Sequence, residues 1–220
     1  GTTSYIQVPH DSTLDPATTD TFTWEVWMKS SEADNNETGR FMDMGAGGPV
    51  FLGMNDTDNA DYIYEAYFLI YDGVGNQSVR GTTKINDGKW HHIAGVLESD
   101  GITMNLYVDG KLEGTEECVG SGIPASLAAN IEIGRYDGGN YFDGEMAMIR
   151  IFSDARTSAE LRADMFNQHS DMDDTGNLIM MQQFDTGEGT TIYDSANSHN
   201  GTMTNTSWST GGTWTAGNIL

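Results

Sequence analysis

The sequence predicts an all-β protein, an antiparallel sandwich of two sheets with one short helix. Many segments alternate apolar and polar residues at period two, as strands with one buried face do. The clearest such segment, residues 90–115, begins by placing on one face Trp90, His92, Ala94 and Val96. The chain also has 27 glycines and only 4 prolines, without a fixed period. That composition is typical of a turn-rich β protein rather than of collagen or a disordered chain.

Two Asp-Gly pairs divide the segment 90–115 into hairpins. Asp100-Gly101 follows the first alternating run, and Asp109-Gly110 follows a second run that aligns Met104, Leu106 and Val108. Asp-Gly favours the tight hairpin turn in which both central residues have positive φ. We therefore expect three antiparallel strands in a meander at the centre of the fold.

The same signals predict the remaining strands in chain order. Upstream of the meander they fall at residues 5–8, 22–28, 40–44, 50–54, 64–71 and 77–83. Downstream they fall at residues 131–135, 146–152, 178–184 and 190–193, with a further segment at 208–214. In the second strand, the residues expected to face the core are Phe22, Trp24, Val26 and Met28.

A capping box marks the one expected helix. Thr157 is followed three residues later by Glu160, so that each side chain can reach the backbone N–H of the other. The helix should span residues 158–166 and turn Leu161 and Met165 toward the sandwich.

The length of 220 residues suits a single sandwich domain spanning residues 1–220. The acidic, polar residues 171–177 are the best candidate for a linker. The tail beyond them, 171–220, either completes the sandwich or begins a second unit. A unit of about 45 residues without disulfides would be marginally stable, so we favour completion.

The charge balance restricts the partners. The chain carries 33 acidic and 10 basic residues, a net charge of −23, which disfavours nucleic acid and anionic membranes. It suits salty surroundings or divalent cations. No apolar run approaches the ~18 residues of a membrane span, so we expect no membrane insertion. Cys118 is the single cysteine and forms no internal disulfide.

An ordered series of motifs resembles the laminin G-like domains of bacterial, archaeal and phage surface proteins. Its centre is WHHIA, a hairpin and LYVDGK, preceded by SYIQVPHDSTLD and TFTWEVWMKS. It continues with IEIGRYDGGNYFDGEMAMIRIFSDARTSAEL and QFDTGEGTTIYDSANSHNGTMTNTSW. The resemblance covers nearly the whole chain and implies a concanavalin A-like jelly roll.

The resemblance also implies a function. We expect a non-catalytic module for carbohydrate or protein recognition, or adhesion, on an extracellular, cell or virion surface, with a glycan or surface protein as partner. The alternative is a structural component of a larger surface or virion assembly, such as a phage fibre or decoration protein, without sugar binding. A glycoside hydrolase is the remote third.

Calcium is the metal to consider. The loop 136–144 gathers Asp137, Asn140 and Asp143, and Ca²⁺ prefers mixed carboxylate and amide oxygens. Laminin G-like domains often hold Ca²⁺ at the rim of the sandwich, in loops of this kind. Their next strand commonly carries an Asp where this chain has Ala147, a departure that weakens the expectation. The alternative for the loop is a solvated turn.

Three aromatic residues are the candidates for contact with a sugar: Trp27, Tyr136 and Tyr141. Trp27 falls on the opposite face of its strand from the core residues, where it could equally form a second buried layer beneath a loop. Tyr136 and Tyr141 flank the acidic loop. Trp24 and Trp90 are more simply core residues.

Other motifs are weaker. Glu32, Asp34 and Glu37 have the spacing of a laminarinase-type hydrolase motif, but polar spacers in a loop favour plain solvation. Residues 171–176 are similar to an EF-hand loop, yet position twelve is Gln182 and no helices flank it. His91 and His92 are adjacent on a strand and point to opposite faces, with His92 inside.

Overall fold

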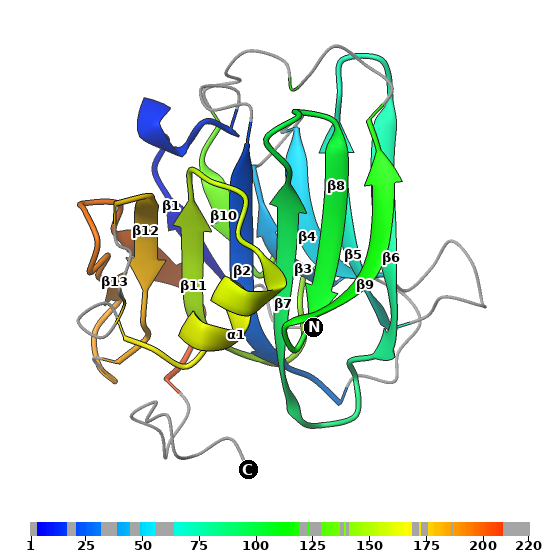
Figure 1. Cartoon of the computed structure of the whole chain (residues 1–220). Coiled ribbons are helices and arrows are strands. Elements are labelled where there is room, and N and C mark those ends of the chain that lie inside the picture. The colour runs from blue at the N-terminus through cyan, green and yellow to red at the C-terminus, as the bar shows by residue number, and fades with distance from the viewer. Residues whose placement is uncertain are drawn as a thin grey trace.

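The computed structural model describes residues 4–16, 21–31, 39–44, 49–55, 64–118, 123, 129–136, 139, 141–168, 172, 176–185 and 187–208. Two antiparallel sheets pack face to face, with one short helix on the outside of the smaller sheet (Figure 1). The predicted β-sandwich is therefore confirmed.

The larger sheet has eight strands. In spatial order they are β13 (Thr191–Ile192), β14 (Gly201–Thr204), β1 (Tyr5–Val8), β10 (Ile131–Ile133), β3 (Gly39–Asp43), β4 (Val50–Asn55), β5 (Glu65–Tyr71) and β6 (Asn76–Lys84). A 3-10 helix, η1 (Ser12–Leu14), follows β1.

The smaller sheet has six strands. In spatial order they are β12 (Leu178–Gln182), β11 (Glu145–Phe152), β2 (Phe22–Lys29), β7 (Trp90–Leu97), β8 (Thr103–Val108) and β9 (Lys111–Glu117). The predicted meander is β7–β8–β9, antiparallel throughout.

The two hairpins of the meander use different turns. Asp109 and Gly110 have φ of 52° and 70°, as the tight turn requires. In the first hairpin only Gly101 has positive φ, at 71°. There the carboxylate of Asp100 accepts the N–H groups of Ile102 and Thr103 and supports a longer loop. The predicted hairpin forms at Asp100-Gly101, but not through the tight turn that Asp-Gly favours.

The main core lies between the sheets. Phe22, Trp24, Val26 and Met28 of β2 all face it, as predicted. β7 differs from the prediction of one buried face, because both of its faces are covered. Its core side carries Ile93 and Leu97, whereas Ala94 and Val96 pack with Leu161 of the helix on the other side.

The helix α1 (Ser158–Asp164) lies over the outer face of the six-stranded sheet (Figure 1). Both hydrogen bonds of the predicted capping box form between Thr157 and Glu160. The helix ends at its C-cap, Met165, so it is shorter than predicted, and Leu161 and Met165 are buried. Among the described residues, no helix has the length and apolar character needed to cross a bilayer.

Strands from the last part of the chain join both sheets. β12 pairs with β11, and β14 pairs with β1. The pairing of β14 was not predicted from the sequence, and residues 209–214 of the predicted segment 208–214 lie outside the described residues.

Candidate functional site

Aromatic and arginine side chains form a continuous set on the outer face of the eight-stranded sheet. On each strand, the residues that alternate with this set, such as Ile6, Leu52 and Phe68, belong to the core. Alternation along a strand therefore turns the set outward. Adjacent strands from β1 to β6, with the turn after β10, contribute Tyr5, Arg135, Arg40, Phe51, Tyr67 and Arg80. We call these residues the Arg–aromatic row.

Guanidinium groups stack on rings along the row. The Cζ of Arg135 lies 3.3 Å from the ring centroid of Tyr5, and the Cζ of Arg40 lies 3.4 Å from that of Phe51. The ring centroids of Phe51 and Tyr67 are 5.1 Å apart, and the Cζ of Arg80 lies 4.5 Å from Tyr67. Each cation–π contact contributes about 0.5–2 kcal/mol, depending on desolvation. Together they hold the side chains in one arrangement.

Two buried carboxylates fix the arginines laterally. Asp43 of β3 and Glu132 of β10 are register partners in the sheet. Asp43 accepts a hydrogen bond from Arg40 at 3.2 Å, and Glu132 accepts one from Arg135 at 2.5 Å. The row thus carries little net charge in a strongly acidic protein. Phe51 is buried beneath Arg40, and the surface of the row consists of the partly exposed side chains of its tyrosines and arginines.

Two of the predicted ligand residues lie beside the row. The ring centroid of Tyr136 is 5.0 Å from the Cζ of Arg40. Its backbone is held in place, because Tyr136 and Gly139 exchange both N–H to carbonyl hydrogen bonds. Tyr141 is half-buried and accepts a hydrogen bond from Arg135. The structure therefore brings Tyr136 and Tyr141 together with residues that the sequence did not single out.

Trp27 is not available to a ligand, so its choice as a binding residue was wrong. Its side chain is buried on the outer face of the six-stranded sheet, and Nε1 donates a hydrogen bond to the carbonyl of Met165 at 2.7 Å. Its ring packs against His92 and Phe166, at centroid distances of 5.4 and 5.2 Å. The turn after α1 covers it. Trp27 therefore belongs to a second buried layer, the alternative that the sequence left open.

The predicted calcium ligands are only partly described. Asp137 and Asn140 lie outside the described residues, and Asp143 is exposed, with its backbone carbonyl accepting from Ser30 at 2.7 Å. Ala147 packs in the layer with Trp27, so no carboxylate is supplied there. Within the described part of the chain, no group of three or more His, Cys, Asp or Glu side chains is placed to hold a metal ion. Calcium binding at this loop stays a prediction.

The motifs at Glu32, Asp34 and Glu37, and at residues 171 and 173–175, also lie outside the described residues. Trp24 is fully buried, as predicted, whereas Trp90 is only partly buried. His92 is buried and His91 faces the opposite side of β7, as predicted.

A second set of charges is sealed beneath α1. Glu25 contacts Arg150, and its other oxygen lies 3.1 Å from Nε2 of His92. Arg156 contacts Asp164 of the helix. Burial raises the pKa of Glu25, but the charge of Arg150 and the hydrogen bond to His92 outweigh it, so that the pKa is lowered overall. These side chains are almost fully buried, and they dock the helix rather than meet a substrate.

The six arginines of the chain thus fall into two groups of three. Arg40, Arg80 and Arg135 belong to the row, whereas Arg150, Arg156 and Arg162 contact α1 or the turn beside it. Sequence reasoning missed the row because its members are scattered along the chain. The signal available was an aromatic residue placed out of phase with the core residues, as at Tyr5 and Tyr67.

The comparisons with known proteins agree with this architecture. A family model described as the concanavalin A-like lectin/glucanases superfamily matches residues 1–162. The chain belongs to this superfamily. The predicted laminin G-like membership is confirmed, and solved laminin G domains are among its structural neighbours.

Several solved structures share the superfamily fold. A candidate carbohydrate-binding protein from Bacteroides ovatus ATCC 8483 is 22% identical, with a TM-score of 0.69 over 91% of this chain and 55% of that one. A heptameric SAP-like pentraxin from Limulus polyphemus is 18% identical, with a TM-score of 0.53 over 73% and 75%. Domains LG4-5 of the mouse laminin alpha1 chain are 12% identical, with a TM-score of 0.51 over 71% and 40%. At these identities the likeness establishes the fold alone.

One protein is similar at the level of sequence. This chain is 30% identical to "Sushi, von Willebrand factor type A, EGF and pentraxin domain-containing protein 1" of Mus musculus over 106 residues, which are 46% of the chain. The same protein of Rattus norvegicus matches equally. The chain spans 3% of the length of these relatives.

Proposed function

We propose that this domain is a non-catalytic recognition module that binds a glycan along the Arg–aromatic row, on an extracellular, cell or virion surface. The observation that carries the proposal is the continuity of the row. Ring faces and guanidinium groups, held by Asp43 and Glu132, run across neighbouring strands from Tyr5 to Arg80. A binding face that is held in place before the ligand arrives loses less entropy on binding.

The chemistry of the row suits sugar rings. Ligand sites combine apolar and aromatic surface with a few placed polar groups, and Tyr5, Tyr67 and Tyr136 supply ring faces with hydroxyl tips. Strands are about 4.8 Å apart, so a row that crosses from β1 to β6 extends roughly 24 Å. Such a surface can contact several successive units of a glycan chain.

The carboxylates of the row support a non-catalytic role. Hydrolysis of a glycosidic bond commonly uses two carboxyl groups about 5–9.5 Å apart, one of them protonated. Asp43 and Glu132 are instead buried and bound to Arg40 and Arg135. The description of the Bacteroides ovatus neighbour as a candidate carbohydrate-binding protein also favours recognition over catalysis.

An array of immobilised glycans tests the proposal. We expect selective, saturable signal from wild-type protein on a subset of glycans, which the protein leaves intact on prolonged incubation. If the protein released sugar from the array, it would be an enzyme, and the proposal of a non-catalytic module would be wrong. An absence of signal on the array would contradict glycan recognition, and self-association in solution would then favour the assembly role.

A further inference from the structure

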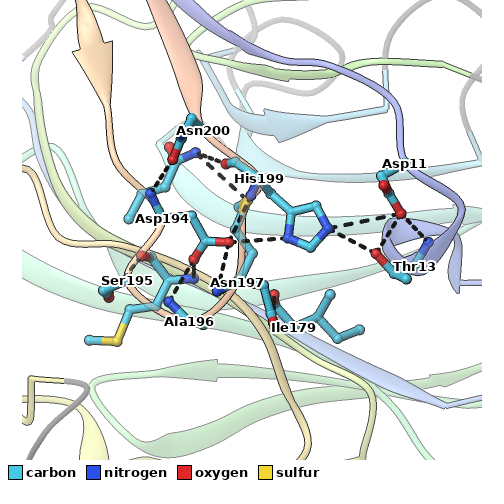
Figure 2. Close-up of polar contacts among 12 residues, drawn as sticks. Asp11, Thr13, Ile179, Asp194, Ser195, Ala196, Asn197, His199 and Asn200 are labelled. Atoms are coloured by element: carbon cyan, nitrogen blue, oxygen red, sulfur yellow. Dashed lines mark hydrogen bonds and ion pairs between the residues drawn. The ribbon is translucent and has the colours of Figure 1, made fainter.

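A hollow of about 740 Å³ opens at a corner of the sandwich that shares no residue with the row. It lies where η1, the corner after β11, the start of β12 and the turn 194–199 meet. Figure 2 shows Thr13, Ile179 and His199 of its lining. Its lining is Asp11, Thr13, Ser153, Gly176, Asn177, Leu178, Ile179, Ala196, Asn197, Ser198 and His199. We call it the corner hollow.

Asp194 builds one wall of the corner hollow. Its buried carboxylate accepts the backbone N–H groups of Ala196 at 2.9 Å, Asn197 at 3.2 Å and His199 at 3.0 Å. It also accepts the N–H of Met181 in β12 at 2.9 Å. One side chain therefore shapes the turn and ties it to the sheet, as Figure 2 shows.

His199 and Asn197 close the wall against neighbouring segments. The ring of His199 lies between Asp194, 3.1 Å from Nδ1, and Thr13 of η1, 2.8 Å from Nε2. The Nδ2 of Asn197 donates to the carbonyls of Leu178 and Ile179 at 3.3 and 2.6 Å. With both amide hydrogens used, the side-chain oxygen of Asn197 is the atom left to accept from a ligand.

The lining defines the class of ligand. It holds a carboxylate, hydroxyls, amides and a histidine, but no lysine or arginine, so it does not suit an anion. The carboxylate of Asp194 is saturated by its donors, and no metal-ligating cluster occurs in the described residues. Leu178, Ile179 and Ala196 add only a small apolar area. A neutral molecule with several hydroxyl groups matches these features, and the volume is within the usual range for small ligands.

We propose that the corner hollow is a second binding site, which takes a neutral sugar or a similar small polyol. Asp11 and Asn197 accept hydrogen bonds from its hydroxyl groups, and Ser198 can donate or accept. This proposal is independent of the proposed function, because the corner hollow could bind a sugar even if the row binds nothing.

Amide chemical shifts of ¹⁵N-labelled protein test this site. The probes are glucose, galactose, mannose, N-acetylglucosamine, lactose, maltose and cellobiose, each titrated separately. At least one should give saturable shifts concentrated at Thr13, Asn197 and Ser198. Ser198→Trp fills the hollow and should weaken that binding about tenfold or more. Ser207→Trp places the same bulk on an exposed serine outside the lining and should leave it unchanged.

Further variants separate the possible outcomes. Asp11→Asn keeps the size of an exposed side chain and should also weaken binding, which provides a second test if Ser198→Trp fails to fold. Tyr67→Ala should not affect the corner hollow. The proposal is overturned if none of the seven sugars gives saturable shifts there. It is equally overturned if binding survives both Ser198→Trp and Asp11→Asn, or is lost with Tyr67→Ala alone.

Discussion

Glu25 of β2 and Arg150 of β11 form an ion pair on the outer face of the six-stranded sheet, with both side chains at most 2% exposed. The same arginine donates to the carbonyl of Asp164 in α1 at 2.8 Å. This buried pair joins the helix to the sheet. Because the two charges are paired, the outer face of the six-stranded sheet can be buried beneath α1 although it carries charged residues.

Glu25→Gln should destabilise the fold strongly. The substitution keeps the shape of the side chain but leaves the charge of Arg150 buried without its partner, at a cost of about 3–5 kcal/mol. The free energy of unfolding in urea measures this. Lys29→Ala removes the exposed pair with Glu145 and should cost about 1 kcal/mol or less. Equal losses in the two variants would show that the buried pair does not stabilise the helix docking.

Gly95→Ala should disrupt the contact between the two sheets. A β-carbon at Gly95 of β7 would lie 2.5 Å from Cδ2 of Phe68 in β5, so the buried ring or one of the two strands must shift. Overpacking of this kind costs about 1–3 kcal/mol. Gly75→Ala is the matched control, because its nearest neighbouring atom is 4.0 Å away. The melting temperature should fall only for Gly95→Ala, and an unchanged value there would contradict the close approach.

His91 should make stability depend on pH. Its ring lies 2.9 Å from Asp109 and 3.2 Å from Asp87, and the hydrogen bond to Asp109 raises its pKa above the ordinary 6.5. A raised pKa stabilises the fold fully below about pH 6.5, and this contribution is lost as pH rises through the folded value. Lys89 lowers the pKa of Asp87 to about 2, and the hydrogen bond from His91 helps to lower that of Asp109 despite burial. The contribution of these carboxylates is lost only in acid.

The test compares wild type with His91→Gln at about pH 6 and about pH 9. The difference in free energy of unfolding should be larger at the lower pH, where both carboxylates are ionised and His91 is protonated. Asp109→Asn, which tolerates the positive φ of the turn, should shrink the same pH dependence. A difference that grows toward alkaline pH would reverse the sign and refute the assignment.

Calcium binding at the loop 136–144 is open to a direct test. If Asp143 is a ligand, calcium should raise the melting temperature by mass action, and Asp143→Ala should remove the shift. Asp185→Ala changes an exposed carboxylate elsewhere and serves as the control. A shift that survives Asp143→Ala, or no shift in the wild type, would leave this loop as a solvated turn.

Local signals in the sequence predicted the local structure. The Asp109-Gly110 turn, the inward alternation of β2 and the capping box at Thr157 each depend on neighbouring residues, and each forms. The interior beneath α1 was predicted only in part. The alternation of β7 placed Ala94 and Val96 on a buried face. The burial of Glu25 and Arg150 was not predicted, because these residues are typical of exposed positions unless they are paired. The pairing of Glu25 with Arg150 brings together segments more than a hundred residues apart.

The candidate site was predictable only in part. Tyr136 and Tyr141 were selected because they flank one loop, and their role in binding stays a prediction. Trp27 was selected wrongly, because the turn that buries it lies far away in the sequence. The row depends on the spatial order β1–β10–β3–β4–β5–β6, which places Tyr5 beside Arg135. Sequence alternation gives the face of a strand but not its neighbours, so the row could be recognised only in the folded chain.

The most direct test of glycan recognition is calorimetric titration of the strongest glycan from the array into wild type, Tyr67→Ala and Tyr193→Ala. Tyr67 lies in the row between Phe51 and Arg80, whereas Tyr193 is an exposed tyrosine outside it. We predict that Tyr67→Ala weakens binding about tenfold, as loss of an aromatic anchor at a binding surface does, and that Tyr193→Ala binds as the wild type. A folded Tyr67→Ala protein with unchanged affinity would contradict the assignment of the row as the binding surface.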